Sequence, residues 1–333
     1  MVQIVDGNII RNELTKNAMG GTELLAHQLI NHVDTNVLKD VQIVSSRVRE
    51  LEDNKIRIFW AHDLPDDPES HFLKDKNNQN KFHKFVFVSN WQMQGYINQY
   101  NIPYSKCIVL QNAINPIDLQ YEKPKDKINL IYYSTPHRGL ELLVPVVNIL
   151  SKKYNNIHLD VYSSFKLYGW EQRDEPYKQL FDYIDNHSHM TNHSSVSNAE
   201  IRKALQYSHI FAYPSIWLET SCLCLMEAMS AGLICVHSNY GALYETAANW
   251  TMMYQMQEDP QQHMSYLYGT LEAAIGKIND EAYKSNLMST KSYADIFYSW
   301  KLRAREWQSL INSLKAQYED RSIPKELFTY KTN

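Results

Sequence analysis

The 333-residue sequence lacks the features that mark several classes of protein. No apolar run approaches the ~18 residues of a membrane-spanning helix, which argues against an integral membrane protein. The net charge of −4 lacks the basic excess of a dedicated nucleic-acid binder, so we expect no nucleic-acid partner. The first residues, Met1 to Asp6, lack the basic and apolar regions of a signal peptide. We therefore expect a cytoplasmic protein.

Cysteine is also scarce, and no Cys-x-x-Cys pair or disulfide framework is present. Its four positions lie in apolar segments and are interpreted as reduced, buried thiols: Cys107, Cys222, Cys224 and Cys235. Three histidines, His187, His189 and His193, fall in a polar segment without the rigid spacing of a metal site. We interpret that segment as a solvated loop, and we expect neither a metal nor a resident cofactor.

Short apolar runs rich in Val, Ile, Phe and Tyr alternate with segments of helical spacing. Such alternation predicts βαβ units and parallel sheets, hence an α/β fold. We expect Thr22 to cap the first helix and Ser197 to cap a later one. The predicted strands are Val2–Val5, Val41–Ser45, Ile56–Trp60, Phe85–Ser89, Cys107–Leu110, Ile128–Tyr133, His158–Tyr162, Ile210–Tyr213 and Ile234–His237.

The length exceeds one ordinary domain of about 100–200 residues, which favours two domains. Prolines and a run of charges interrupt the pattern between Asn115 and Asp126. This break predicts one α/β domain over residues 1–117 and a second over residues 118–290. The pattern beyond Ile278 is helical to the end, so residues 291–333 form a C-terminal helical segment.

The most informative segment begins where the predicted strand ends at Tyr213. A loop carrying Glu219 follows, Thr220 or Ser221 is expected to cap the next helix, and Gly232 is expected to end it. This order places Glu219 at the carboxyl edge of a parallel sheet, where α/β sheets bind ligands. The helix N-terminus suits a phosphate group. The plain structural alternative is a surface loop before a core helix.

A second acidic residue, Glu227, stands eight positions after Glu219 and one to two turns into the helix. This spacing resembles the Glu, seven residues, Glu hallmark of the family 4 (group 1) retaining glycosyltransferases. The stretch Glu227-Ala-Met-Ser-Ala-Gly232 is similar to that family's Glu-Ala-Met-Ala-x-Gly. Gly241-Ala-Leu-Tyr-Glu245 resembles its Gly-x-x-Glu segment with one residue more.

The resemblance implies a GT-B fold, in which two Rossmann-like domains face each other across a cleft. The domain over residues 1–117 would serve the acceptor, the domain over 118–290 would bind the nucleotide sugar, and the segment 291–333 would cross back to the first domain. The implied reaction moves a sugar from a UDP- or GDP-sugar to a hydroxyl acceptor with retention of configuration. No Asp-x-Asp pair stands where a metal-dependent enzyme would need it, so we expect a metal-independent reaction.

The same resemblance implies roles for residues of the second domain. Glu219 would lie by the donor sugar, Glu227 would hold the ribose hydroxyls, and Arg138 would neutralise the departing diphosphate in place of the family's Lys. The family's upstream Arg is not evident, since Tyr132 or Tyr133 stands near its place. Thr220, Ser221 and Cys222 replace the glycines that usually face the phosphates. Lys166 could add a second charge, and a solvated loop lysine is its alternative.

Two segments of the first domain carry further resemblance. Gly20 and Gly21, in Met19-Gly-Gly-Thr-Glu23, resemble a Gly-Gly-x-Glu loop that faces the donor, and a plain turn is the alternative. His62, followed by Asp63, resembles the family's acceptor-side histidine. A structural hydrogen bond or a chance metal pair would explain the same two residues.

Alternatives to the transferase stay open at this stage. Another GT-B enzyme, such as an epimerase or a phosphorylase, would share the fold. A degenerate GT-B protein would act as a non-enzymatic glycan or partner-binding module. The expected partners are a nucleotide-sugar donor and a glycan or lipid-linked acceptor. Peripheral membrane association is a further option, although no decisive basic amphipathic helix is present.

Overall fold

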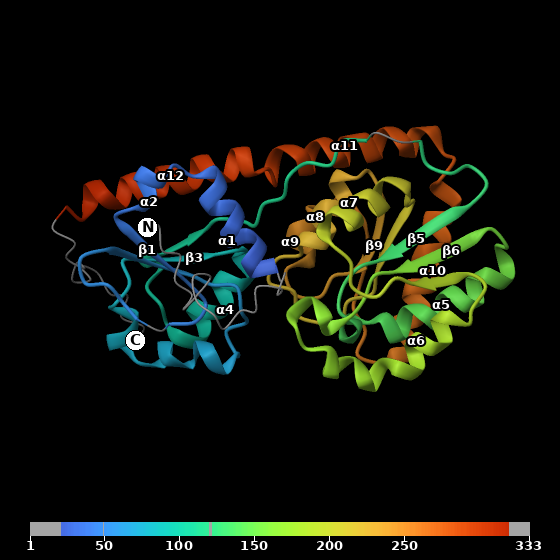
Figure 1. Ribbon diagram of the computed structural model, residues 1–333, viewed down its shortest axis with the longest axis horizontal. Helices are drawn as coiled ribbons and strands as arrows, with labels where there is room; N and C mark the ends of the chain where they lie inside the picture. Colours follow the sequence, from blue (N-terminus) through green and yellow to red (C-terminus); the bar gives the residue numbers. More distant parts are fainter. Residues whose placement is uncertain (1–20, 49, 120–121, 320–333) are drawn as a thin grey trace, which may run out of the picture. The chain divides into compact units, whose positions relative to one another are not determined.

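The computed structural model describes residues 21–48, 50–119 and 122–319 (Figure 1). The predicted strand Val2–Val5 and Gly20 lie outside the described residues. The chain divides into two compact units. The first holds the described residues from Thr22 to Gln111 and from Arg303 on, and the second holds Gly21 and the described residues from Asn112 to Leu302. Both contain parallel sheets, which confirms the predicted α/β class.

The first unit is built on a parallel sheet whose described strands lie in the order β1-β2-β3-β4. All four match predicted strands to within two residues at each end: β1 (Val41–Ser45), β2 (Ile56–Trp60), β3 (Lys84–Phe87) and β4 (Cys107–Val109). The helices are α1 (Gly21–His32), α2 (Thr35–Leu38), α3 (Lys76–Gln79) and α4 (Asn90–Tyr100), with 3-10 segments η1 (Pro68–Lys74) and η2 (Tyr104–Lys106). Because α1 begins at Gly21, Thr22 lies inside the helix and the prediction that it is the cap was wrong.

Aromatic side chains fill the core of the first unit. Phe59 on β2 packs against Phe82 and Phe85, with ring centroids 5.5 and 5.7 Å apart. Helix α12 (Trp300–Gln317) begins in the second unit and continues in the first from Arg303. Its Trp307 packs edge-on against Trp60 at 5.1 Å, so the end of the chain completes the first unit's core.

The second unit contains a larger parallel sheet with the strand order β10-β9-β8-β5-β6-β7. Its strands are β5 (Ile128–Tyr132), β6 (Ile157–Val161), β7 (Met190–Asn192), β8 (Ile210–Tyr213), β9 (Ile234–Ser238) and β10 (Met252–Tyr254). The sequence prediction missed β7 and β10, the two edge strands, because each is short and contains neither Val nor Ile. The chain runs from β5 outward to β7, returns to β8 beside β5, and then runs outward to β10.

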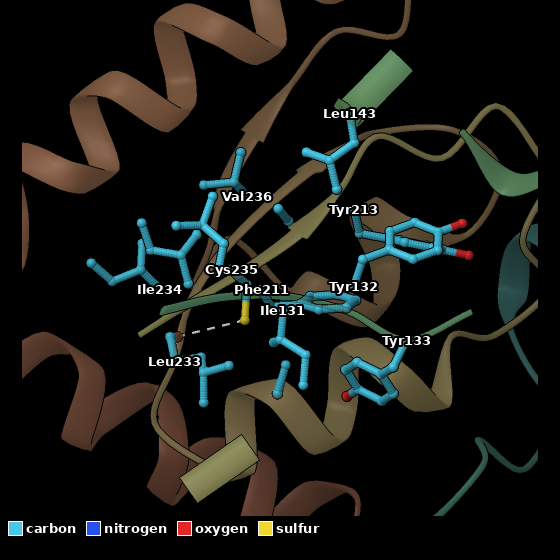
Figure 2. Packing of buried hydrophobic residues seen from close by; sticks show 14 of the residues in the cluster. Ile131, Tyr132, Tyr133, Leu143, Phe211, Tyr213, Leu233, Ile234, Cys235 and Val236 are labelled. Carbon is cyan, nitrogen blue, oxygen red and sulfur yellow. Dashed lines mark hydrogen bonds between the residues drawn. The ribbon is translucent and has the colours of Figure 1, made fainter. Parts of the chain in front are cut away.

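Helices cover both faces of this sheet (Figure 1). Helices α5 and α10 pack together on one face, and α8 and α11 pack together on the other. Figure 2 shows Leu143 of α5 on one side of the strands and Tyr133 on the other. The helices are α5 (Leu140–Lys153), α6 (Lys178–Asp185), α7 (Asn198–Tyr207), α8 (Leu223–Ser230), α9 (Leu243–Ala247), α10 (Pro260–Lys277) and α11 (Glu281–Phe297), with 3-10 segments η3 (Pro136–Arg138), η4 (Phe165–Tyr168) and η5 (Glu171–Tyr177).

Two predicted helix boundaries are confirmed by the backbone. Ser197 caps α7, and its side chain and that of Glu200 form a reciprocal capping box. Gly232 follows α8 with a φ of +65°, the left-handed conformation that ends many helices. Within the described part of the chain, no helix combines the length and apolarity needed to cross a bilayer.

Candidate active site

The strand order of the second sheet reverses between β5 and β8, which lie side by side. In open α/β sheets, ligands bind outside the carboxyl ends of the strands at such a point. Arg138 ends η3, just after β5, and Glu219 lies in the loop just after β8. The fold therefore brings the two main predicted site residues to the same edge of one sheet.

Gly139 lets the loop after β5 approach the loop after β8. Its φ is +107°, and a Cβ atom added there would lie 2.2 Å from the carbonyl oxygen of Pro214. No side chain fits that distance, and few residues other than glycine adopt that φ. The glycine next to Arg138 is therefore required for the close contact between the two loops.

The backbone of Glu219 is held by the segment that begins at Gly241. The two residues form an isolated parallel bridge, and the Ala242 N–H donates to the Glu219 carbonyl oxygen at 2.7 Å. Gly241 has a φ of +64°, and an added Cβ would lie 2.5 Å from the same oxygen. The Gly-x-x-x-Glu segment thus has a structural role, because its first residues fix the loop that carries Glu219.

The carboxylate of Glu219 forms the centre of a buried polar cluster. Nη1 of Arg138 donates to its Oε1 at 2.6 Å, and the Tyr213 hydroxyl donates to the same oxygen at 2.5 Å. The side chains of Arg138 and Glu219 are 22% and 6% exposed. Burial disfavours the charged guanidinium, but Glu219 and Tyr213 outweigh it and hold the pKa of Arg138 well above its usual value. Arg138 is therefore charged, and its hydrogen bond to Glu219 is charge-assisted.

An aromatic ring lies beside Arg138, and aromatic rings also contact its neighbour His137. Its guanidinium lies 5.8 Å from the ring centre of Trp217, which is 42% exposed. The imidazole of His137 stacks on Phe165 at 5.2 Å and meets the Trp217 ring edge-on at 5.0 Å. Burial, with help from the neighbouring arginines Arg138 and Arg173, lowers the pKa of His137 to about 4, so this imidazole is neutral at pH 7.

The start of α8 differs from the prediction. Cys222 occupies the N-cap position and its side chain forms no cap hydrogen bond, so the prediction that Thr220 or Ser221 is the cap was wrong. Both residues lie in the loop before the cap instead. The hydroxyl of Ser221 is buried and has no hydrogen-bond partner among the described residues. Cys222 is buried, which raises its thiol pKa well above the usual value.

Glu227 lies on α8 and faces an arginine from α7. Nη1 of Arg202 lies 3.4 Å from its Oε1, and the Glu227 side chain is 12% exposed. Burial raises the pKa of the carboxyl group, whereas Arg202 and a hydrogen bond from Asn198 oppose that shift. Arg202 also donates to the carbonyl oxygens of Asn115 and Pro116 at 2.9 and 2.8 Å. The arginine thus joins Glu227 to the chain segment that leads into β5.

Two further residues have partners outside the Arg138–Glu219 cluster: Lys166, the second candidate for phosphate charge, and Tyr133. Tyr133, near the place of the family's upstream Arg, donates its hydroxyl to the Cys224 carbonyl oxygen, and the Cys224 thiol donates to the Tyr133 carbonyl oxygen at 3.1 Å. Tyr133 therefore joins β5 to α8. Lys166 on η4 is 62% exposed and pairs with Glu171 at 3.3 Å.

In the first unit, His62 follows β2. Its backbone N–H donates to the Ser46 hydroxyl at 3.0 Å, and its ring lies 4.4 Å from the Trp60 ring. Burial lowers the pKa of His62 to about 3 and raises that of Asp63 above its usual value. Gly21 is the first residue of α1, and Gly20 lies outside the described residues.

The three histidines of the polar segment are not simply solvated. His193 bonds Asp160 at 2.8 Å and stacks on Tyr162 at 4.3 Å, while His187 and His189 bond the Asn148 side chain and the Ile157 carbonyl oxygen. The solvated-loop interpretation was therefore wrong, because this segment packs against β6. No group of three or more His, Cys, Asp or Glu side chains in the described ranges is arranged to hold a metal ion.

Sequence analysis missed two residues that contact the predicted acids. Tyr213 was treated only as the last residue of a strand, although a tyrosine at a buried strand end needs a partner for its hydroxyl. Arg202 follows the apolar position Ile201 on α7 and carries no motif. The first could have been found from its residue type, whereas the second depends on how α7 packs.

Comparison with known proteins identifies part of the chain. Residues 116–262 match the family model described as glycosyl transferases group 1. The comparison with curated proteins yields no match. A glycosyltransferase from Rickettsia africae ESF-5 is 16% identical with a TM-score of 0.65, over 91% of this chain and 84% of its own.

Two further structures show the same fold. HepE from Anabaena, solved in complex with UDP-glucose, is 13% identical with a TM-score of 0.62, over 87% of this chain and 82% of its own. Sucrose-phosphate synthase from Thermosynechococcus elongatus is 14% identical with a TM-score of 0.62, over 79% and 69% of the two chains. The fold of the chain is therefore GT-B, and the segment 116–262, which contains Arg138 and Glu219, is the part that matches the group 1 glycosyltransferase model.

Proposed function

We propose that the protein transfers a sugar from a nucleoside-diphosphate donor to a hydroxyl acceptor with retention of configuration. The observation that carries the proposal is the buried Arg138–Glu219 pair at the strand reversal of the second sheet, inside the family-matched segment. A guanidinium suits a leaving diphosphate, and a carboxylate suits the hydroxyls of a sugar.

In this proposal, the bond between the anomeric carbon and the diphosphate oxygen breaks while a bond to the acceptor oxygen forms on the same face. The acceptor's hydroxyl proton passes to the departing diphosphate. Arg138 stabilises the negative charge that develops on the leaving group, so the reaction needs no metal. Glu219 orients the sugar and accepts hydrogen bonds from its hydroxyls.

The remaining predicted residues complete the proposed donor site. Glu227 would accept hydrogen bonds from the ribose hydroxyls, with Arg202 orienting its carboxyl group and opposing the rise in its pKa. The loop before α8, with Thr220, Ser221 and Cys222, would face the diphosphate together with Gly20 and Gly21. Lys166 would add charge at the edge, and His62 would serve the acceptor side. A UDP-sugar is the first donor to test, because the similar HepE structure holds UDP-glucose.

The acceptor class and cellular location follow from the same proposal. A glycan or a lipid-linked glycan in the cytoplasm would supply the accepting hydroxyl. Proton NMR of the product, followed from the first minutes, would show whether the anomeric configuration of the donor is kept. An inverted product would overturn the retaining mechanism and leave the transferase assignment intact.

The proposal is tested by donor binding. UDP, GDP, ADP and their sugars are added in turn to the purified protein, and the melting temperature is recorded, because a ligand of the folded state raises it. One nucleotide and its sugar should stabilise the protein. Glu227→Ala should weaken binding of the nucleotide, and Arg138→Ala should lower turnover by about 10²–10³-fold. Lys153→Ala, which removes a surface ion pair with Glu272 on the same unit, is the control.

The outcomes separate the alternatives. Failure of every nucleotide sugar to bind would favour a degenerate binding protein. Binding with turnover that needs no acceptor, or that requires orthophosphate, would indicate an epimerase or a phosphorylase on the same fold. Unchanged kinetics in both the Glu227 and Arg138 variants would refute the proposed site.

A further inference from the structure

Tyr213 is the last residue of β8 and is fully buried. Its ring stacks on Phe211 at 5.3 Å and lies 5.9 Å from the Tyr132 ring, and this packing in a fully buried position restricts its orientation. Figure 2 shows these rings in the core of the second unit. The ring therefore presents its hydroxyl at a fixed point, where it donates to Oε1 of Glu219 at 2.5 Å.

The hydrogen bonds of Glu219 are unevenly divided between its two oxygens. Tyr213 and Arg138 both donate to Oε1. No hydrogen bond within the described ranges uses Oε2, although the side chain keeps 6% exposure. A carboxylate clamped at one oxygen can rotate little, so the other oxygen points in one direction and is the one a ligand meets.

Binding of a nucleotide sugar would affect the two residues that hydrogen-bond Oε1 differently. A diphosphate attracts the Arg138 guanidinium, which must then share its charge between the phosphate and Glu219. Tyr213 is neutral, and burial holds its pKa well above the usual value, so its hydroxyl stays protonated whatever binds.

We propose that Tyr213 is a positioning residue: it holds Oε1 of Glu219 so that Oε2 binds a hydroxyl of the donor sugar, and it keeps that position when Arg138 engages the diphosphate. The inference rests on the proposed function and deepens it. It assigns recognition of the sugar part of the donor to a hydroxyl on β8 that acts through Glu219. Binding of the nucleotide part of the donor does not depend on Tyr213.

Tyr213→Phe removes the hydroxyl and keeps the ring. Calorimetry with UDP and UDP-glucose, or with the nucleotide and its sugar that the binding panel selects, should show an unchanged affinity for the nucleotide. Affinity for the nucleotide sugar should fall about tenfold or more, the usual effect of losing one hydrogen bond to a charged group. A protein that had merely loosened would lose affinity for both ligands, so the unchanged nucleotide affinity also shows that the site is folded.

A double-mutant cycle tests whether Tyr213 acts through Glu219. In the Glu219→Gln background, adding Tyr213→Phe should change the ratio of the two affinities by less than twofold, because the interacting partner is already lost. Tyr254→Phe is the matched control: Tyr254 is also buried at the end of a strand of this sheet, and its hydroxyl bonds His263 at 2.9 Å. It should leave both affinities unchanged.

The results test the role of Tyr213 separately from the proposed transferase function. Equal affinities of Tyr213→Phe and wild type for the nucleotide sugar would overturn the inference and leave the transferase standing. Additive effects of the two substitutions would also overturn it, since Tyr213 would then act independently of Glu219. Failure of the wild type to bind any nucleotide sugar would defeat the proposed function itself.

Discussion

The two units contain matching strand–helix segments that begin in the same way. β3 of the first unit and β8 of the second are each preceded by a histidine, His83 and His209. The backbone N–H of His83 donates to the carbonyl oxygen of Arg57 at 2.8 Å, and that of His209 donates to the carbonyl oxygen of Asn129 at the same distance. In return, the backbone N–H groups of Arg57 and Asn129 donate to the Nδ1 atoms of the two rings at 3.0 and 3.1 Å. Each imidazole thus extends a parallel ladder by one bond.

The segments differ after the strand. In the first unit, Ser89 caps α4 by accepting from the Gln92 N–H at 3.0 Å, and the Gln92 side chain accepts from the Val88 N–H at 3.0 Å. In the second unit, residues 214–222 separate β8 from α8, and the side chain of the N-cap residue Cys222 forms no capping hydrogen bond. The start of α8 therefore lacks the side-chain cap that stabilises α4, and a longer loop that carries Glu219 precedes it. The turn after β3 thus caps a helix, whereas the loop after β8 carries a residue of the proposed donor site.

The largest effect is expected where the loop after β5 contacts the loop after β8, at Gly139. Gly139→Ala would force a side chain to within 2.2 Å of a backbone oxygen at a φ of +107°. We expect a loss of about 2–6 kcal/mol, the sum of backbone strain and overpacking, and no measurable transfer. Gly95→Ala in α4 meets only Pro65, at 3.1 Å, and gains helix propensity, so stability should stay within about 1 kcal/mol. Urea unfolding measures both, and similar losses would contradict this difference.

The second-largest difference is expected between the effects of removing one ion pair in each unit. Glu219→Gln removes the charge that faces the buried Arg138, so turnover should fall about 10²–10³-fold. The first unit has a pair of similar length, Arg57 with Asp53 at 3.0 Å, but Asp53 is fully exposed. Asp53→Asn should therefore leave the melting temperature and the turnover unchanged, because water screens such pairs. Turnover of both variants is measured by steady-state kinetics. An equal loss of turnover in Glu219→Gln and Asp53→Asn would contradict the expected difference.

The histidine before β8 predicts a pH dependence. Burial, followed by the charge of Lys123, lowers the pKa of His209 to about 4, whereas an unfolded histidine titrates near 6.5. The unfolded state therefore binds more protons between these values, and stability rises with pH across that window. The contribution is fully present above about pH 6.5 and is lost as the pH falls towards 4, amounting to about 2 kcal/mol by pH 5.

His209→Asn tests this contribution, because an asparagine oxygen can accept from the Asn129 N–H but cannot take up a proton in this range. Lowering the pH from 7.5 to 5 reduces the free energy of unfolding. This reduction should be about 2 kcal/mol smaller in the variant than in the wild type. An identical pH dependence of the two proteins would show that His209 is not the titrating group.

The strands were predictable because each of the well-predicted ones is a short segment rich in Val, Ile, Phe or Tyr. Val41–Ser45 and Ile56–Trp60 appear with the predicted bounds, since a strand buried on both faces leaves this local signature. The short edge strands β7 and β10 leave none. The caps at Thr22 and at Thr220 or Ser221 were wrong because a cap depends on the path of the loop before it. That path is set by tertiary contacts such as the bridge between Glu219 and Gly241.

The site was predictable only as separate pieces. Glu219, Glu227 and Arg138 stand in local motifs, so their presence beside strands and helices could be inferred. The contact between Arg138 and Glu219 joins residues 81 positions apart and depends on β5 lying next to β8. Strand order is a property of the whole sheet, and no local pattern encodes it. The same holds for the contacts of Tyr213 and Arg202 with the two acids.

The smallest effect concerns the serines before α4 and α8. Ser89→Ala removes an N-cap bond in the first unit and should cost about 1 kcal/mol. Ser221→Ala removes a buried hydroxyl without a partner among the described residues, so stability should stay unchanged or rise slightly. If the loop before α8 binds the donor, the second variant should still weaken nucleotide affinity by a few-fold, measured by calorimetry. Loss of stability without loss of affinity in Ser221→Ala would mean that this loop is structural, as its counterpart in the first unit is.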